Sequence, residues 1–439
     1  MISRLNRRPY VTANLIKLLH LLGVDDVLYT YFDMQSAALG PMRAMTQLTK
    51  TYFNNPLFPF SQTYMGKIMA ASADVLEGVI RHRGKPEWGF QAIHREDGIH
   101  PIDLARIDHR PFGDLIRFKC DLAKTPKKIL LVSPMSGHFA TLLRGTVKTL
   151  VEHHEVYVTD WTDASKVPAS DGEFGLDEYI EYLVDYMKLL GPDLHVIAVC
   201  QPAPLVLAAV SILAANDDPA QPSTMTLMGG PIDPGAAETE VTKLADSKSL
   251  SWFKDNLTAT VPLQYEGSGR RVYPGFLQLA AFISMNSMRH VDAHMQHFNN
   301  LIKGDGDSAE SHNKFYDEYL SVMDVTAEFY LDTIHHIFQE RSLPNGTMTW
   351  KGQSVDPSKI KKTALLTVEG ELDDISAPGQ TEAAHEMCSS LVKGKHKNHV
   401  EAGVGHYGIF NGRKWRESVS VVINNFIEKH HPKAKGDKS

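Results

Sequence analysis

Short apolar runs alternate with segments of helical periodicity through the middle of the chain. The runs have the composition of buried strands and cover residues 129–132, 156–159, 194–199 and 225–228. Between them, apolar residues recur every three or four positions, as on one face of a helix, over residues 142–151, 176–190 and 205–213. This alternation predicts a mostly parallel β-sheet flanked by helices.

The pattern changes after this α/β segment. From about Val241 to Thr349, long helical stretches show no clear strand, and a strand pattern returns only at residues 363–368. The remaining predicted elements are a helix at 378–391, a short strand at 399–401 and a helix after Gly412. An all-helical block between two strands of one sheet predicts a cap inserted over the edge of that sheet.

The first part of the chain shows helical patterns to about Leu48, followed by a loop-rich stretch over 54–59. We therefore expect four regions along the chain. They are a largely helical N-terminal region at 1–110, a first core segment at 111–240, a helical cap at 241–350 and a second core segment at 351–439.

Cys200 is the strongest candidate for a nucleophile. It lies where the apolar run 194–199 meets a predicted helix that opens with Gln201 and Pro202. A strand-to-helix elbow of this kind exposes one side chain at the carboxyl edge of a sheet. The serine form of the elbow, G-x-S-x-G, does not occur in the sequence, and Ala198 and Pro202 hold the glycine positions around Cys200. The alternative interpretation is a buried structural thiol.

The order of the later elements predicts the partners of Cys200. In folds with a nucleophile elbow, the acid follows a late strand and the histidine comes last in the chain. Asp373 follows the strand at 363–368, and His406 lies in a glycine-rich loop after the next strand. His406 would accept the thiol proton, and Asp373 would hold its tautomer. Asp374 remains an alternative for the acid, and we favour Asp373.

An acyl-transfer site also needs hydrogen-bond donors for the oxyanion. The backbone N–H of Gln201 follows the nucleophile directly and is one candidate. The second should come from the loop after the strand at 129–132, where Pro134 has no N–H and Met135 or Ser136 remains. The alternative is an ordinary turn between a strand and a helix.

Composition excludes several classes of protein. The net charge of −7 provides no basic field for nucleic acid. The three cysteines are too few and too scattered for a disulfide framework, which favours a reducing compartment. No apolar run is long enough to span a bilayer. The apolar stretch 15–22 contains Lys17 and His20 and is predicted to be an amphipathic helix rather than a signal peptide.

The histidine spacing permits a metal site, but other features of the sequence disfavour one. His290, His294 and His297 are spaced to share one helix face, and His335 and His336 follow nearby. The H-E-x-x-H motif is missing, and a cysteine with its own base needs no metal. We expect no metal and no cofactor, with these histidines in polar packing.

Several separated segments resemble the intracellular polyhydroxyalkanoate (polyhydroxybutyrate) depolymerases. They are Asn55–Pro59, Ser133–Gly137, Val199–Pro202, Met228–Asp233, Met285–Asn286 with Arg289–His290, Ala327–Leu331, and Gly370–Glu371 with Asp373–Ile375. The resemblance implies an α/β-hydrolase fold in which a cysteine replaces the lipase-type serine. It also implies that Cys200 is the nucleophile, Asp373 the acid and His406 the base.

The resemblance further implies the substrate and the location. The substrate would be amorphous poly(3-hydroxybutyrate), cleaved through a thioacyl-enzyme to 3-hydroxybutyrate monomer or oligomers. The protein would be cytoplasmic, with the storage-granule surface as its partner. The sequence does not indicate the oligomeric state, and a homodimer stays open. Apolar surface for the polymer is expected from aromatic residues of the cap, namely Trp252, Phe253, Phe276 and Phe282.

Two other functions stay open from the sequence. A polyhydroxyalkanoate synthase-like acyltransferase would use the same three residue types with hydroxyacyl-CoA, but synthases resemble G-x-C-x-G at the elbow, and Ala198 and Pro202 replace both glycines here. A non-enzymatic granule-associated protein would have no need of a nucleophile on an elbow. Both differences favour ester hydrolysis.

Overall fold

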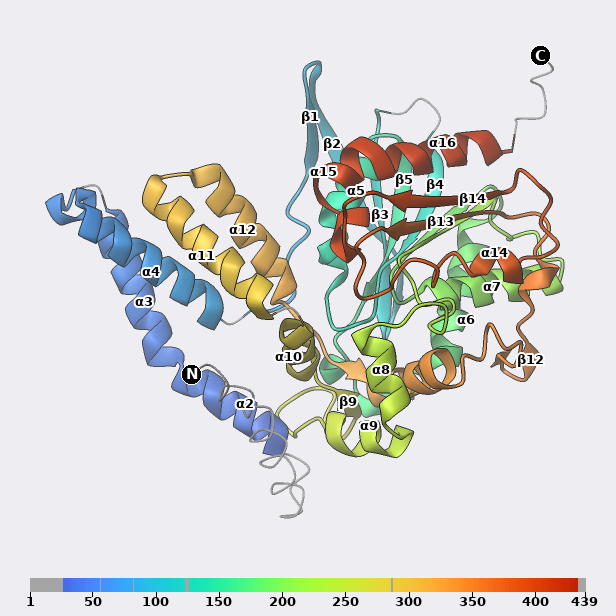
Figure 1. Ribbon diagram of the computed structural model, residues 1–439, viewed down its shortest axis with the longest axis horizontal. Coiled ribbons are helices and arrows are strands. Elements are labelled where there is room, and N and C mark those ends of the chain that lie inside the picture. The colour runs from blue at the N-terminus through green and yellow to red at the C-terminus, as the bar shows by residue number, and fades with distance from the viewer. Residues whose placement is uncertain (1–26, 56, 82, 123–125, 286, 433–439) are drawn as a thin grey trace, which may run out of the picture.

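The computed structural model describes residues 27–55, 57–81, 83–122, 126–285 and 287–432. Its centre is a nine-stranded sheet in the order β1-β2-β3-β5-β4-β6-β7-β13-β14 (Figure 1). The strands are β1 (Ala92–Arg95), β2 (Gly98–Arg110), β3 (Gly113–Cys120), β4 (Lys127–Val132), β5 (His154–Trp161), β6 (His195–Val199), β7 (Thr224–Met228), β13 (Ala364–Gly370) and β14 (His396–Glu401). The pairs from β5 to β14 are parallel, and β1 to β3 join through antiparallel pairs. This is the expected α/β-hydrolase fold.

The central strands are buried on both faces. The covering helices are α5 (Arg144–Leu150), α6 (Leu176–Leu190), α7 (Ala203–Ala215) and α16 (Ser420–His430). On β4, Leu130 and Val132 belong to the core that contains α6 and α7, whereas Ile129 and Leu131 belong to the core that contains α5 and α16. Because neither face meets water, these strands are continuous apolar runs in the sequence.

The predicted strands of the α/β segments are confirmed as β4 to β7, β13 and β14. The predicted helix at 378–391 is wrong over most of its length, because only α14 (Ala384–Met387) forms there. The buried carboxylate of Glu369 accepts hydrogen bonds from the backbone N–H groups of Gly379, Thr381 and Glu382 at 2.8–3.1 Å. These bonds hold the start of the segment in turns. The closing helix is α15 (Gly412–Lys414), a π-helical turn (Trp415–Val419) and α16.

The region before residue 111 contains sheet strands that the sequence analysis did not predict. β1 and β2 form an antiparallel hairpin at the edge of the sheet. Few of its residues are buried, and a register shift between Arg106 and Asp108 interrupts the alternation of its side chains. An exposed, irregular edge strand therefore leaves no apolar run to detect. The division of the chain into four regions stays a prediction, although the sheet begins before residue 111.

The segment expected to be an all-helical cap also contains strands. Its helices are α8 (Glu240–Ser247), α9 (Leu250–Leu257), α10 (Gly275–Met285), α11 (Ser287–Lys303), α12 (Gly306–Tyr319) and α13 (Ala327–Asp332), followed by a π-helix (Thr333–Gln339). Between them, β8 (Ala259–Thr260), β9 (Arg271–Tyr273) and β10 (Val325–Thr326) form a small antiparallel sheet. Strands of two or three residues are too short to produce a periodic pattern. A further hairpin joins β11 (Thr349–Trp350) to β12 (Gln353–Ser354).

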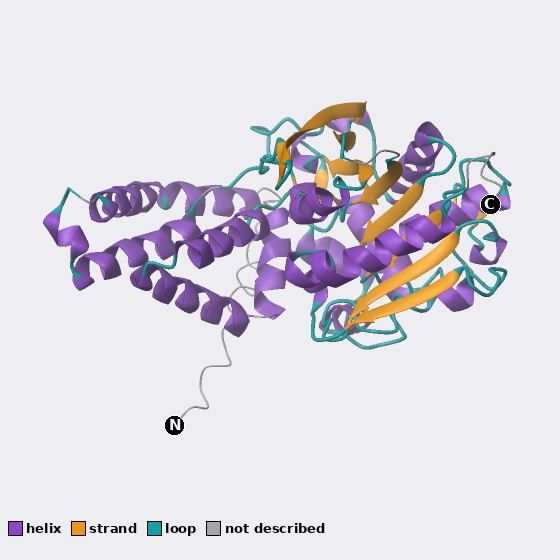
Figure 2. Ribbon diagram, turned by 90° about the horizontal axis from the view of Figure 1, so that it is seen from above, coloured by secondary structure: helices purple, strands orange, loops and turns teal. Residues whose placement is uncertain are grey.

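Helices from two distant parts of the sequence form an arm that projects from the sheet (Figures 1 and 2). The N-terminal helices are α2 (Val27–Ala38), α3 (Gly40–Asn54) and α4 (Tyr64–Ile80), of which α4 was not predicted. α4 packs against α11 and α12 of the cap segment. The amphipathic helix predicted over residues 15–22 lies outside the described residues. Among the described helices, none combines the length and apolar character needed to cross a bilayer.

Candidate active site

Cys200 occupies the turn between β6 and α7. Its φ angle is +67°, a left-handed conformation that is strained for a residue with a side chain. The turn is fixed from both sides, since the Cys200 N–H donates to the carbonyl of Met228 at 2.7 Å and the Ala203 N–H donates to the carbonyl of Cys200 at 3.0 Å. The half-buried thiol faces a cavity. This is the geometry of a nucleophile elbow.

Two glycines after β7 make room for the elbow and its partners. A Cβ atom on Gly230 would lie 2.2 Å from the Cβ of Ala203 and 2.6 Å from the carbonyl oxygen of Cys200. Gly229 has a φ of +54°, and a Cβ there would lie 3.3 Å from both Asp373 Oδ2 and His406 Cε1. From the sequence, this pair was part of the segment Met228–Asp233 that resembles the depolymerases, with no structural role assigned to it. Two consecutive glycines directly after the predicted strand at 225–228 were the signal in the sequence that could have indicated close packing at the site.

His406 and Asp373 are brought together beneath Cys200. His406 Nδ1 lies 2.7 Å from Asp373 Oδ2, and both side chains are buried. The other carboxylate oxygen, Oδ1, accepts the backbone N–H groups of Ile375 and Ser376, each at 2.9 Å. Asp374 is exposed at the surface of the same turn. Of the two candidate acids, Asp373 is therefore the one held against His406.

The environment of His406 favours its protonated form. Burial lowers the pKa of His406, but the charges of Cys200 and Asp373 and hydrogen bonds to both side chains raise that pKa well above its ordinary value. Because Nδ1 is directed at Asp373, Nε2 is the ring nitrogen left for the thiol. A protonated ring beside the sulfur stabilises a thiolate.

The loop after β4 borders the thiol. Pro134, Met135 and Ser136 line the same cavity as Cys200. In the structure the Met135 N–H donates to the side-chain oxygen Oε1 of Gln201 at 3.2 Å. One of the predicted oxyanion donors, the Met135 N–H, is therefore already hydrogen-bonded to an amide oxygen of the protein. This side-chain contact could not be inferred from the sequence.

The same loop is anchored to the cap segment. The Met323 N–H donates to the carbonyl of Gly137 at 2.7 Å, and His138 Nε2 donates to the carbonyl of Tyr319 at 3.1 Å. Burial lowers the pKa of His138 to about 4, so its ring is neutral and acts as a structural donor. These bonds fix the position of the loop relative to the elbow.

A cavity of about 440 Å³ opens above Cys200 and His406. Its walls are largely apolar, and the cap segment contributes residues of α8, α9, α10, α13 and the π-helix to them. Of the four aromatic residues expected to supply apolar surface, Phe253 and Phe282 line the cavity. Phe276 instead packs against Tyr29 and Phe32 of α2. Tyr407, which the sequence analysis overlooked, also lines the cavity, and burial raises its pKa well above the ordinary value.

The histidines considered as metal ligands make other contacts. His290 Nδ1 lies 2.9 Å from the Tyr316 hydroxyl, and His297 Nε2 lies 3.3 Å from Asp74 Oδ1. In the described part of the chain, His335, His336 and Glu340 do bring potential ligand atoms within 4.8 Å of one another. Glu340 is already within 3.3 Å of His335 and 3.1 Å of His336, so the three groups satisfy one another.

Comparison with known proteins gives one family match and a set of solved structures with low sequence identity. The solved structures that resemble this one include a thermophilic esterase from Thermogutta terrifontis (13% identity, 78% of this chain and 100% of that chain, TM-score 0.40). Others are a putative lipase from Acinetobacter baumannii (13%, 75% and 92%, 0.40) and a putative non-heme bromoperoxidase from Mycobacterium tuberculosis (12%, 76% and 97%, 0.44). No curated protein matches the sequence. Residues 229–431 match the family described as PHB de-polymerase C-terminus, and this match supports a PHB depolymerase family.

Proposed function

We propose that the protein hydrolyses the ester bonds of amorphous poly(3-hydroxybutyrate) in storage granules, using Cys200 as nucleophile, His406 as base and Asp373 as the acid that orients it. The family match supports ester hydrolysis. The observation that carries the finer proposal is the hydrogen-bonded series Cys200, His406 and Asp373 below a left-handed elbow at the base of an apolar cavity.

The first half of the reaction forms a thioester. His406 takes the proton of Cys200, and the thiolate attacks the ester carbonyl carbon. The electron pair of the C=O bond moves to oxygen, which the N–H groups of Gln201 and Met135 would stabilise. The intermediate then collapses, the C–O bond to the polymer alcohol breaks, and His406 protonates that alcohol as it leaves. The acyl group remains on Cys200.

The second half returns the enzyme to its starting state. His406 takes a proton from water, whose oxygen attacks the thioester carbonyl. Collapse of this intermediate breaks the C–S bond, and the proton returns to the sulfur. The product is 3-hydroxybutyrate or a short oligomer with a free carboxyl group. Asp373 accepts two backbone hydrogen bonds as well as the ring N–H of His406, which fixes the orientation of the ring in both halves of the reaction.

Gln201 has two parts in this scheme. Its backbone N–H directly follows the nucleophile and is an oxyanion donor. In the absence of substrate, its side-chain oxygen accepts the hydrogen bond of the Met135 N–H. The substrate oxygen has to replace that side-chain oxygen when it enters the hole. The resting contact keeps a buried donor satisfied until then.

The direct test is to incubate the protein with native amorphous granules and to identify the soluble products by liquid chromatography and mass spectrometry. We expect 3-hydroxybutyrate or its short oligomers, and none from the Cys200→Ala protein. Granules that release no soluble hydroxyacid, or the same release from Cys200→Ala, would contradict the proposal.

A further inference from the structure

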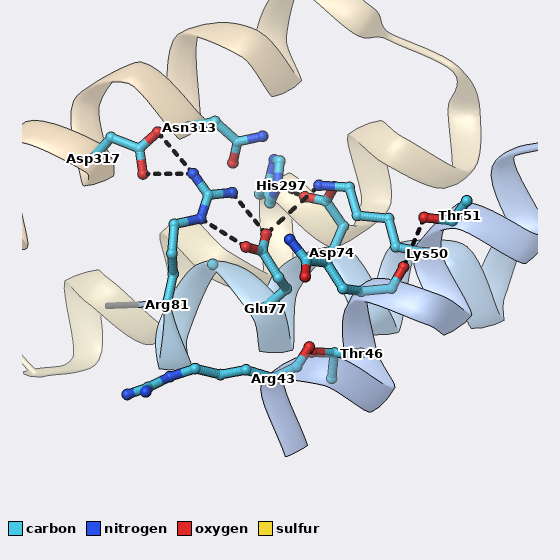
Figure 3. A network of polar contacts seen from close by, with 12 residues as sticks. Arg43, Thr46, Lys50, Thr51, Asp74, Glu77, Arg81, His297, Asn313 and Asp317 are labelled. Atoms are coloured by element: carbon cyan, nitrogen blue, oxygen red, sulfur yellow. Dashed lines mark hydrogen bonds and ion pairs between the residues drawn. The ribbon is translucent and has the colours of Figure 1, made fainter. Parts of the chain in front are cut away.

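The helical arm, defined here as α3, α4, α11 and α12, has polar groups in its interior. Lys50 on α3 lies 2.6 Å from Asp74 on α4, and Asp74 also contacts His297 on α11 (Figure 3). Glu77 and Arg81 pair at 2.7 Å, and Arg81 continues the network to α12. Lys50 lowers the pKa of Asp74 against the opposing effect of burial. The contacts that join these helices thus include a network of ionised groups.

Apolar side chains of the same helices point outward. On α3, Met45 and Leu48 are 71% and 72% exposed, and Leu57 in the connection to α4 is 85% exposed. On α4, Met65 and Met69 are 56% and 41% exposed. A helix in water normally places such a stripe against its neighbours and its charges outside. We call this set of exposed apolar residues on α3, α4, their connection and α11 the outer apolar surface.

This surface carries little charge on α3. The charged residues of that helix are Arg43 and Lys50. Arg43 donates to the carbonyls of Ile80 and Ser36, and Lys50 pairs with Asp74 inside the arm. Neither cation is left to attract an anionic partner. An uncharged, apolar partner fits this part of the face, since large exposed apolar patches mark interaction sites.

The arm lies next in the chain to a helix that lines the catalytic cavity. Ala281 and Ser284 on α10 line the cavity. α11 follows α10 in the chain, and Met288, Val291 and Met295 are exposed on it. A partner bound along the arm would therefore be presented to the cavity.

We propose that the outer apolar surface binds the surface of an amorphous polyester body and holds the mouth of the cavity against it. The proposal rests on the proposed function. Methionine is unbranched and flexible, which suits contact with a disordered surface of no fixed shape. The exposed apolar side chains are spread over α3, α4, α11 and the connection at the end of the arm away from the sheet (Figure 1). The surface of an extended apolar phase can contact all of these side chains at once. A second copy of the chain would instead need them gathered in one patch that matches its own surface.

The test separates binding from chemistry. Cys200→Ala protein, which cannot turn over, is sedimented with amorphous poly(3-hydroxybutyrate) granules. The arm variant adds Met45→Gln, Leu48→Gln and Leu57→Gln, all at strongly exposed positions. The matched control adds Leu189→Gln, Leu263→Gln and Val392→Gln, which are exposed at 55%, 92% and 64% outside the arm. We expect the arm variant to bind at least about tenfold more weakly than its parent, and the control to bind like it.

With Cys200 restored, the arm variant should hydrolyse a soluble hydroxybutyrate oligomer at the wild-type rate and granules much more slowly. Equal granule binding by the arm variant, or no binding by the parent, would overturn the proposal. So would equal binding of the parent to phosphatidylcholine vesicles of the same area, or a dimer that the arm variant dissociates without loss of granule binding. If Cys200 protein releases no product while binding still depends on the arm, the proposed function fails and this inference stands.

Discussion

The sheet core and the helical arm distribute their side chains in opposite ways. In the core, the residues of β4 to β7 are almost all buried, and apolar side chains pack into two layers. In the arm, Asp74, Glu77 and His297 are buried, while Met45 and Leu48 are exposed. The core thus resembles an ordinary soluble enzyme, and the arm resembles an element that works against an apolar phase. The difference indicates that chemistry and attachment belong to separate parts of the chain.

The largest expected effect is on the nucleophile of the core. Cys200→Ala should lower ester hydrolysis by roughly 10⁵-fold, because no other group can form the acyl intermediate. Thermal unfolding should change little, since the thiol is half-exposed at a cavity. Cys120→Ala, outside the cavity, is the control and should keep its activity. Near wild-type turnover in Cys200→Ala would move the chemistry to another residue.

The second effect separates two neighbouring acids. Asp373→Asn should lower turnover by about 10⁴-fold, because it removes the charge that holds the tautomer and the cation of His406. Asp374→Asn is the matched control and should change turnover by less than about threefold, because its side chain is exposed. Steady-state kinetics on a soluble oligomer measures both. The reverse order of the two losses would shift the acid by one residue.

The reactivity of the three cysteines should differ with pH. The raised pKa of His406 keeps a cation beside Cys200 near neutral pH, whereas burial raises the pKa of Cys388 to about 12 and also raises that of Cys120. At pH 6.5, iodoacetamide should therefore label Cys200 first, at least about tenfold faster than the others. Peptide mapping by mass spectrometry gives the rates. Labelling of Cys120 or Cys388 ahead of Cys200 would contradict the thiolate–imidazolium pair.

Glycine substitutions should behave differently in the two regions. Gly230→Ala should destabilise the core by about 2–3 kcal/mol, because the added methyl group meets Ala203 and the Cys200 carbonyl. On α4, the Cβ atom added by Gly78→Ala would have no neighbour within 4 Å. Because alanine has a higher helix propensity than glycine, this substitution should stabilise the arm by about 0.5–1 kcal/mol. Urea unfolding measures both. Equal effects at the two positions would remove the contrast in packing between core and arm.

A further effect, smaller than that of Gly230→Ala, concerns the polar interior of the arm. Lys50→Met should leave Asp74 with His297 as its remaining partner in the network and cost about 1–2 kcal/mol. The loss should be local, so hydrogen exchange should rise in α3, α4 and α11 and stay unchanged in β4 to β7. Lys67→Met, at an exposed position of α4, is the control. Faster exchange across the sheet would show that the arm and core are one cooperative unit.

The sequence predicted the parts of the molecule in which burial and periodicity agree. The middle parts of β4 to β7 are mostly apolar because both faces are covered, so the positions of these strands and the place of Cys200 could be inferred from the sequence. β2 is exposed and irregular, and β8 to β10 are too short, so none of them leaves a pattern. Helices were predicted up to about Leu48 and over 241–349, but α4 and its packing against α11 and α12 were not, because exposed apolar residues such as Met65 and Met69 do not mark the buried face of α4.

The candidate site shows the same limit. Chain order was enough to propose Asp373 and His406, which lie 2.7 Å apart in the structure. The close approach at Gly230 and the contact of the Gln201 side chain with Met135 depend on how distant segments meet. Such contacts carry no local signal in a single sequence.

The central claim is that an acyl group is carried on Cys200. It is tested most directly by acid-quenching the protein during turnover of a soluble hydroxybutyrate oligomer and locating the acyl adduct by peptide mass spectrometry. We expect hydroxybutyryl units on the peptide that contains Cys200, lost on treatment with hydroxylamine and missing from Cys200→Ala. An adduct on a serine or on another cysteine, or an adduct on the Cys200→Ala protein, would contradict the account.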